Sequence, residues 1–223
     1  MPPSKSPTKS PSKKRPAATP PAATKTEAEA RTFYYYLFAK RAAKTLGIAI
    51  LLYAFSAHLI PASPVATKLQ FMHTYSLGFV YAAWYILYIT RLYAGLNANG
   101  ARAPTGIDRP DQHAYEVVGG GTVKMVTEGD AGRFNRAQRG AYNMDETMPI
   151  FISGLLLNGA VLGPAVVLIA AMYSYGAVLF CNTYTAGGSR INGFLYKASA
   201  ESVSAQLALL IAVKALAGPA LPY

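Results

Sequence analysis

The chain has 223 residues, of which 52% are hydrophobic and only 14% are charged. This composition is too apolar for an ordinary soluble domain and indicates a membrane protein. The formal net charge of +11 is a local feature, because basic residues concentrate before residue 45, where only Glu27 and Glu29 oppose them. A single cysteine, Cys181, excludes an intramolecular disulfide framework.

Residues 1–30 are rich in proline, serine, lysine and alanine and contain no aromatic residue. Such a segment cannot bury enough apolar surface to offset the entropy of ordering, so we expect a disordered tail. Its SPTK and SPSK repeats resemble basic tails that lie along DNA, but beside membrane helices attraction to anionic lipid is favoured over nucleic acid. No apolar run follows the first charges, so we expect no cleaved secretory signal, whereas a plastid-type leader is not excluded.

Five stretches are expected to cross the membrane as helices. The first lies within 31–62, an aromatic and basic interfacial segment followed by an apolar run from Leu46 to Ile60. The other four make a bundle over 73–217, with spans at about 73–96, from within 134–151 to about 160, 165–184 and 199–217. Pro149 is expected to bend the third of the five spans, which ends at about residue 160. The loop 97–133 is expected to hold a small β-hairpin around Gly119, Gly120 and Gly121.

The placement of positive charge supports five spans. With a cytosolic N-terminus, all basic residues except Lys68 and Lys214 fall on the cytosolic side, as the positive-inside rule requires. In this arrangement Arg190 and Lys197 belong to a cytosolic loop before the last span. We expect a membrane of the endoplasmic reticulum or nuclear envelope, while a mitochondrial outer or plastid membrane stays open.

Four polar side chains mark the cytosolic entrance of the third span. Arg136, Arg139, Asn143 and Glu146 fall within an arc of roughly 80° on a helix. Ionised groups in hydrocarbon are costly unless they are paired or turned inward, so this stripe is expected to line a mostly cationic pocket. A small water-soluble anion suits such a pocket, and a lipophilic second substrate can arrive through the bilayer. Taken singly, the same residues could serve as positive-inside anchors or as interhelical hydrogen bonds.

The pattern R-x-x-R-x-x-x-N-x-x-E-x-x-P-x-F, from Arg136 to Phe151, resembles the membrane-associated proteins in eicosanoid and glutathione metabolism (MAPEG). The resemblance covers about 73–217 and is nearest to the microsomal glutathione transferases of type 3 and leukotriene C4 synthase. It implies an all-α membrane protein, a four-helix transmembrane bundle here extended by an additional N-terminal helix. It also implies a homotrimer that binds glutathione between subunits and needs no metal.

The resemblance also implies roles for individual residues. Arg136 and Arg139 would hold glutathione carboxylates, Asn143 its backbone and Glu146 its α-amino group. Tyr184 matches a glutathione-binding tyrosine, and Arg102 lies near the place of an assisting arginine. Arg190 matches, within one residue, the cation that stabilises the thiolate, so it is the expected catalytic residue. The chain departs from the family at three positions, which are Ala141, Asp145 and Phe180.

Two functions follow as hypotheses. The leading one is a membrane-bound glutathione transferase or peroxidase, in which the glutathione thiolate attacks a lipophilic electrophile or a lipid hydroperoxide. The alternative is a non-catalytic, lipid-binding or accessory subunit, docked into a larger membrane complex by its additional helix, tail and loop. Neither the electrophile nor the choice between the two reactions follows from the residues.

Overall fold

The computed structural model describes residues 25–60, 63–108 and 111–217, so residues 1–24 of the predicted tail lie outside the described residues. The described chain is mostly helical and carries one small antiparallel hairpin. Its elements are α1 (Glu27–Ala54) with a π-helical turn (Phe55–Leu59), α2 (Val65–Thr74), α3 (Gly78–Arg102), β1 (Tyr115–Val118), β2 (Thr122–Met125), α4 (Gly129–Leu162), α5 (Ala165–Thr185) and α6 (Ile191–Ala217).

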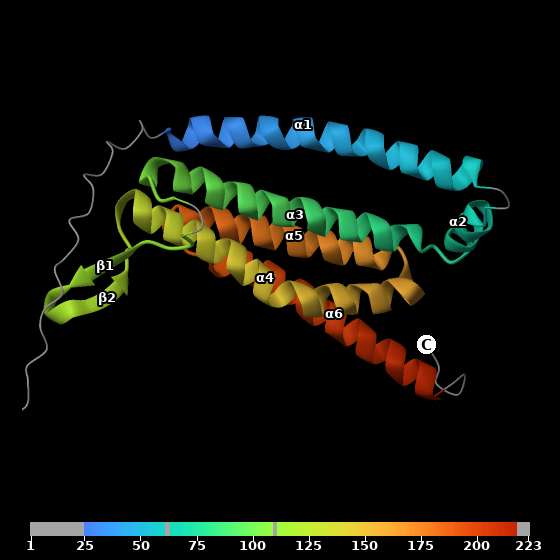
Figure 1. The fold of residues 1–223 in the computed structure, drawn as a ribbon. Helices are drawn as coiled ribbons and strands as arrows, with labels where there is room; N and C mark the ends of the chain where they lie inside the picture. The colour runs from blue at the N-terminus through green and yellow to red at the C-terminus, as the bar shows by residue number, and fades with distance from the viewer. Residues whose placement is uncertain (1–24, 61–62, 109–110, 218–223) are drawn as a thin grey trace, which may run out of the picture.

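Helices α3, α4, α5 and α6 form a bundle, and α1 lies alongside α3 (Figure 1). Helix α6 packs against α5 and α4 and diverges from them toward its C-terminal end. The hairpin and the start of α1 lie at one end of the bundle, and α2 lies at the other. We call the first the hairpin end; it is the end predicted to be cytosolic.

Three helices are long and apolar enough to cross a membrane, namely α1 with its π-helical turn, α5 and α6. None of the most apolar window of α1 is buried inside the protein, as expected of a helix that faces lipid. Helices α3 and α4 have a sufficient length, but their polar residues lower the mean hydropathy. Their membrane crossing therefore stays a prediction.

The hairpin was predicted correctly, with Tyr115 opposite Met125 and Val118 opposite Thr122. Gly120 and Gly121 have positive φ angles of 77° and 81°, a conformation that glycine adopts without steric cost. The span predicted for 165–184 coincides with α5, apart from one residue at its end.

Three predicted boundaries were wrong. Helix α1 starts inside the presumed tail, because Thr26 and Glu29 form a capping box that satisfies its first amides. The span expected from His73 is interrupted by Ser76, whose positive φ of 56° separates α2 from α3. The last helix begins at Ile191 rather than near residue 199, so Lys197 lies in α6 and not in a loop.

Helices α5 and α6 approach each other at two glycines. A Cβ on Gly193 would lie 2.3 Å from the amide nitrogen of Phe180, and one on Gly176 would lie 2.5 Å from that of Lys197. Both distances are far below van der Waals contact, so any larger residue would push the backbones apart. Small residues serve the same purpose in membrane bundles generally, where they let helices pack backbone to backbone.

A polar network, which we call the α1 clasp, ties the start of α1 to three bundle helices. Glu27 accepts hydrogen bonds from Arg133 at 2.6 and 3.1 Å and from Arg31 at 2.9 Å. Arg31 also donates to the side-chain oxygen of Asn97 at 2.6 Å. The side-chain amide of Asn97 in turn donates to the Thr185 hydroxyl at 2.8 Å. The clasp therefore joins α1 to α3, α4 and α5.

The clasp predicts an energetic coupling between Glu27 and Arg133. Because the pair is partly buried and doubly hydrogen-bonded, we expect a double-mutant cycle of Glu27→Gln and Arg133→Gln to give a coupling of about 1–3 kcal/mol. Denaturant-induced unfolding in mild detergent measures it. Glu116→Gln, on the exposed hairpin, should add to Arg133→Gln without coupling, and additivity for Glu27→Gln would contradict the clasp.

Candidate functional site

The polar stripe predicted around Arg139 lies on one continuous helix, α4. Arg139 contacts Glu146, two turns further along, with its Nη1 atom 3.1 Å from Oε1 of the carboxylate. Both side chains are about half exposed, at 52% each. The structure therefore brings these two predicted binding residues together on an accessible surface.

Asn143 faces α6 and contacts Lys197. The Lys197 ammonium donates to the backbone carbonyl of Asn143 at 3.2 Å and to its side-chain oxygen at 3.1 Å. It also lies 3.5 Å from the Glu201 carboxylate, one turn along α6. Only 4% of Lys197 is exposed, so a charge predicted to lie in a solvated loop instead joins α4 to α6.

A crevice of about 260 Å³ opens between α4 and α6, beside these polar residues. Its lining combines polar and apolar side chains, which are Glu146, Thr147, Ile150, Phe151, Gly154, Glu201, Ser204 and Ala205. We call it the α4–α6 crevice. Two carboxylates flank it, and its walls become apolar along α4, so it offers both a polar and a lipophilic compartment.

Tyr184 and Arg190 meet at the hairpin end of α5 and α6. The Arg190 guanidinium lies over the Tyr184 ring, 5.0 Å from its centroid, a cation–π geometry. The connecting turn contains Gly187, whose φ of 83° favours glycine. A Cβ atom at this position would lie 3.7 Å from the Arg136 guanidinium, so the turn passes close to that side chain. Arg136 itself donates to the backbone carbonyl of Thr127 at 2.7 Å. These residues share the hairpin end but make no direct contact with Glu146 in the described ranges.

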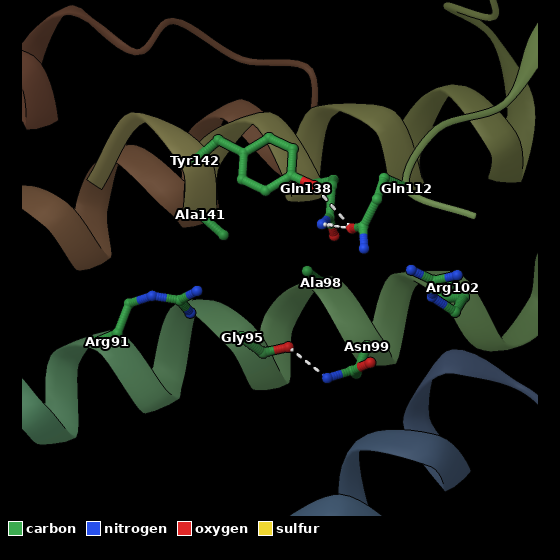
Figure 2. Close-up of a pocket in the computed structure, with 9 residues that line it drawn as sticks. All are labelled: Arg91, Gly95, Ala98, Asn99, Arg102, Gln112, Gln138, Ala141 and Tyr142. Carbon is green, nitrogen blue, oxygen red and sulfur yellow. Dashed lines mark hydrogen bonds between the residues drawn. The ribbon is translucent and has the colours of Figure 1, made fainter. Parts of the chain in front are cut away.

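Arg102 lies away from this crevice, on the opposite side of α4. It donates to the backbone carbonyls of Asp108 and Asp111 and stacks over the Phe134 ring at 4.6 Å. Figure 2 shows the cavity of about 460 Å³ that it lines together with Arg91, between α3 and α4. Arg102 is therefore separated from the other predicted glutathione-binding residues within one chain.

The Gln112 side chain closes one side of this second cavity. Its oxygen accepts hydrogen bonds from both Gln138 and Tyr142 on α4. The neighbouring His113 packs near Tyr142, with 5.6 Å between ring centroids. Burial lowers the pKa of His113, and the positive charge of Arg139 lowers it further, so the imidazole is neutral at pH 7.

The three departures from the family pattern each have a place in the fold. Asp145 pairs with Arg91 of α3 through two hydrogen bonds, which explains a carboxylate on the face opposite Arg136. Ala141 is buried on the side of α4 that meets α3, and Phe180 is buried on α5, where its ring packs 5.7 Å from Tyr184. All three residues serve helix packing.

The sequence pattern missed Lys197, Glu201 and Ser204 as members of the site. A lysine followed four residues later by a glutamate, inside an apolar helix, is the signal that could have found the first two. Ser204 accepts a hydrogen bond from Asn158 through its hydroxyl oxygen at 3.1 Å. Within 25–60, 63–108 and 111–217, no three histidine, cysteine or acidic side chains gather as metal ligands.

No protein-family model matches the chain, and no curated protein matches it either. The class that the fold itself defines is a mostly helical protein with three candidate membrane-spanning helices.

The contacts of Lys197 predict a structural cost for its removal. Lys197→Met keeps the apolar stem but removes the ammonium that donates to the partly buried side-chain oxygen of Asn143, so we expect a loss of about 1–3 kcal/mol in unfolding free energy. Thermal unfolding in mild detergent tests this expectation. Lys68→Met, at an exposed position of α2, is the control and should change stability by less than about 0.5 kcal/mol. Equal effects would contradict the buried network.

Proposed function

We propose that the protein is a membrane-bound glutathione transferase or peroxidase whose glutathione site lies on the α4 stripe and the α4–α6 crevice. The observation that carries this proposal is the half-exposed pair of Arg139 and Glu146, 3.1 Å apart. An ion pair exposed to this degree contributes only about 0–1 kcal/mol. A ligand that supplies the opposite charges can therefore replace it at little cost.

Glutathione is such a ligand, since its γ-glutamyl end carries a carboxylate and an ammonium on one carbon. Arg139 matches the carboxylate, because a guanidinium binds it with two parallel hydrogen bonds, and Glu146 matches the ammonium. The Lys197 ammonium donates hydrogen bonds to both oxygens of Asn143. This contact orients the Asn143 side-chain amide, whose NH₂ group can then donate to a ligand carbonyl. Arg136 and Tyr184 complete the expected contacts at the hairpin end.

The chemistry needs a thiolate, because the free thiol is a poor nucleophile and has a pKa of about 8.5. Arg190 is proposed to stabilise that thiolate by its fixed positive charge. In the transferase reaction, the sulfur forms a bond to an electrophilic carbon and the leaving group departs with the bonding electrons. In the peroxidase reaction, the sulfur takes the terminal oxygen of a hydroperoxide while the O–O bond breaks and the other oxygen leaves as the protonated alcohol. A second glutathione then reacts with the resulting sulfenic acid to give the disulfide and water.

A lipophilic second substrate is supported by the other wall of the crevice. Ile150 and Phe151 line it, and Ile150 is among the most exposed apolar residues of the described chain. A substrate dissolved in the bilayer can reach such a wall without passing through water. The two substrates would then meet at the boundary between polar and apolar lining.

Glutathione binding and turnover test the proposal separately. Calorimetry should detect glutathione binding, and Arg139→Ala should raise the Kd at least about tenfold by removing a charged hydrogen-bond donor. Arg190→Ala should lower the rate of conjugation to a hydrophobic aryl halide, or of fatty-acid hydroperoxide reduction, much more than it lowers affinity. Lys124→Ala, on the hairpin, should change neither quantity. Tight binding without either activity would remove the catalytic role, and no binding would remove the site.

A second candidate function, an accessory subunit of a larger membrane complex, is favoured by α1. Only its first turns are clasped to the bundle, while its apolar window is entirely unburied within one chain. A partner helix could pack along that window. The proposed enzyme instead requires a homotrimer, in which a neighbouring subunit covers the half-exposed α4 stripe.

The two functions predict different assemblies. Native mass analysis in mild detergent should give an enzyme near three times 23.8 kDa, after subtraction of bound detergent. The trimer should persist at protein concentrations near the glutathione Kd, because the shared site requires it. Stable co-migration with other polypeptides, and no self-association of the purified chain, would favour the accessory subunit.

A further inference from the structure

A second groove, independent of glutathione, runs between α1 and α3 and has a volume of about 550 Å³. We call it the α1–α3 groove. Helix α1 contributes Arg41, Ala42, Thr45 and Ala49 to its lining, and α3 contributes Tyr85 and Tyr88. Because α1 is a candidate membrane-spanning helix, the groove lies between helices at the edge of the protein, where lipid is the solvent.

Small residues of α1 line the groove between the larger Phe38 and Leu46, and the polar clasp holds α1 to the bundle at one end. Ala42, Thr45 and Ala49 recur at helical spacing and project little from the backbone. The Thr45 hydroxyl is engaged by backbone carbonyls of its own helix, at 3.0 Å from Arg41 and 3.1 Å from Ala42. It therefore needs no partner in the groove, to which its methyl group adds apolar surface.

Polarity changes along the groove in the way that a lipid changes along its length. Arg41 is its charged residue and lies next to Lys40 and Lys44, at the depth where the aromatic and basic interfacial segment ends. Ala49 lies eight residues further, about 12 Å along the helix, within the apolar run that begins at Leu46. A headgroup site is thus followed directly by an acyl-chain site.

The Arg41 side chain makes no hydrogen bond or ion pair with any residue in the described ranges. The acidic residue of α1 nearest to it in sequence, Glu29, is twelve residues away and is held in the cap with Thr26. A guanidinium without a carboxylate partner at headgroup depth suits phosphate, which it binds with two parallel hydrogen bonds. The cytosolic leaflet supplies such phosphates on negatively charged lipids.

We propose that the α1–α3 groove binds one anionic phospholipid, with its phosphate on Arg41 and one acyl chain along Ala42, Thr45 and Ala49, against Tyr85 and Tyr88. The bound lipid fills the space that the clasp leaves between α1 and the bundle.

The single tryptophan reports on this groove. Trp84 stacks on Tyr88 with 5.7 Å between ring centroids, and Tyr88 lines the groove. Lipids with brominated acyl chains quench tryptophan fluorescence on contact. In nanodiscs of phosphatidylcholine, brominated phosphatidylserine should quench wild-type Trp84 at about tenfold lower mole fraction than brominated phosphatidylcholine, since a charged hydrogen-bonding group contributes at least that factor.

Single-residue variants distinguish a specific lipid-binding site at Arg41 from a general electrostatic attraction to anionic lipid. Arg41→Ala should abolish the preference for phosphatidylserine, whereas Lys40→Ala should retain it, because Lys40 lies near the Tyr36 ring at 5.9 Å and does not line the groove. Ala49→Phe should lower quenching by both lipids by filling the acyl-chain site. If Lys40→Ala and Arg41→Ala reduce the preference equally, the attraction is diffuse and the proposal is wrong.

Native mass spectrometry of the wild-type protein tests the same site without a variant. Protein taken from nanodiscs of mixed phosphatidylserine and phosphatidylcholine should retain one phosphatidylserine per chain. Retention of no lipid, or of both lipids in proportion to the membrane, would overturn the proposal. If residues that line the groove can be cross-linked to α1 of a second copy of the chain, a protein helix occupies the groove and the lipid proposal is wrong.

Discussion

The contact between the backbones of α5 and α6 at Gly176 and Gly193 determines much of the arrangement around the crevice. Two helices that approach this closely leave no room between them for a long side chain to turn. Lys197, four residues after Gly193, reaches the Asn143 oxygens of α4, while Glu201 on its own helix also contacts its ammonium. A packing constraint on α5 thereby decides where a charge lies on α6.

The polar residues of helix α4 lie on two opposite faces and make different contacts there. One face carries Arg139, Asn143 and Glu146, which are accessible or contact α6. The other face carries Asp145, which pairs with Arg91 of α3. This pair favours one rotation of α4 about its axis, but its side chains are 42% and 41% exposed, so it adds only about 0–1 kcal/mol to the packing of the buried Ala141 and Met144 on the same helix. The accessible stripe thus keeps its direction through contacts that no ligand touches.

Much of the helical arrangement was predictable from local pattern, but the long-range pairings were not. Three glycines between alternating residues predicted the hairpin, and the uninterrupted apolar run predicted α5. Lys197 was misplaced because a positive charge ordinarily marks a loop, and its partners lie fifty residues away in α4. The spacing of Arg139 and Glu146 predicted a shared face but not their ion pair, and the partner of Asp145 depended on the register between α3 and α4. The glutathione roles came from resemblance, which the fold alone does not test.

The α1 clasp also sets an order of assembly. Glu27 and Arg31 are made early, but their partners Arg133 and Asn97 follow 106 and 66 residues later, and Thr185, which both of these contact, is made later still. The clasp is therefore complete only after α5 has been synthesised. Until then, the exposed apolar surface of α1 can face lipid, and Glu27 and Arg31 can stay hydrated at the membrane boundary. The first helix thus completes its polar contacts only when the chain has been made as far as the end of α5.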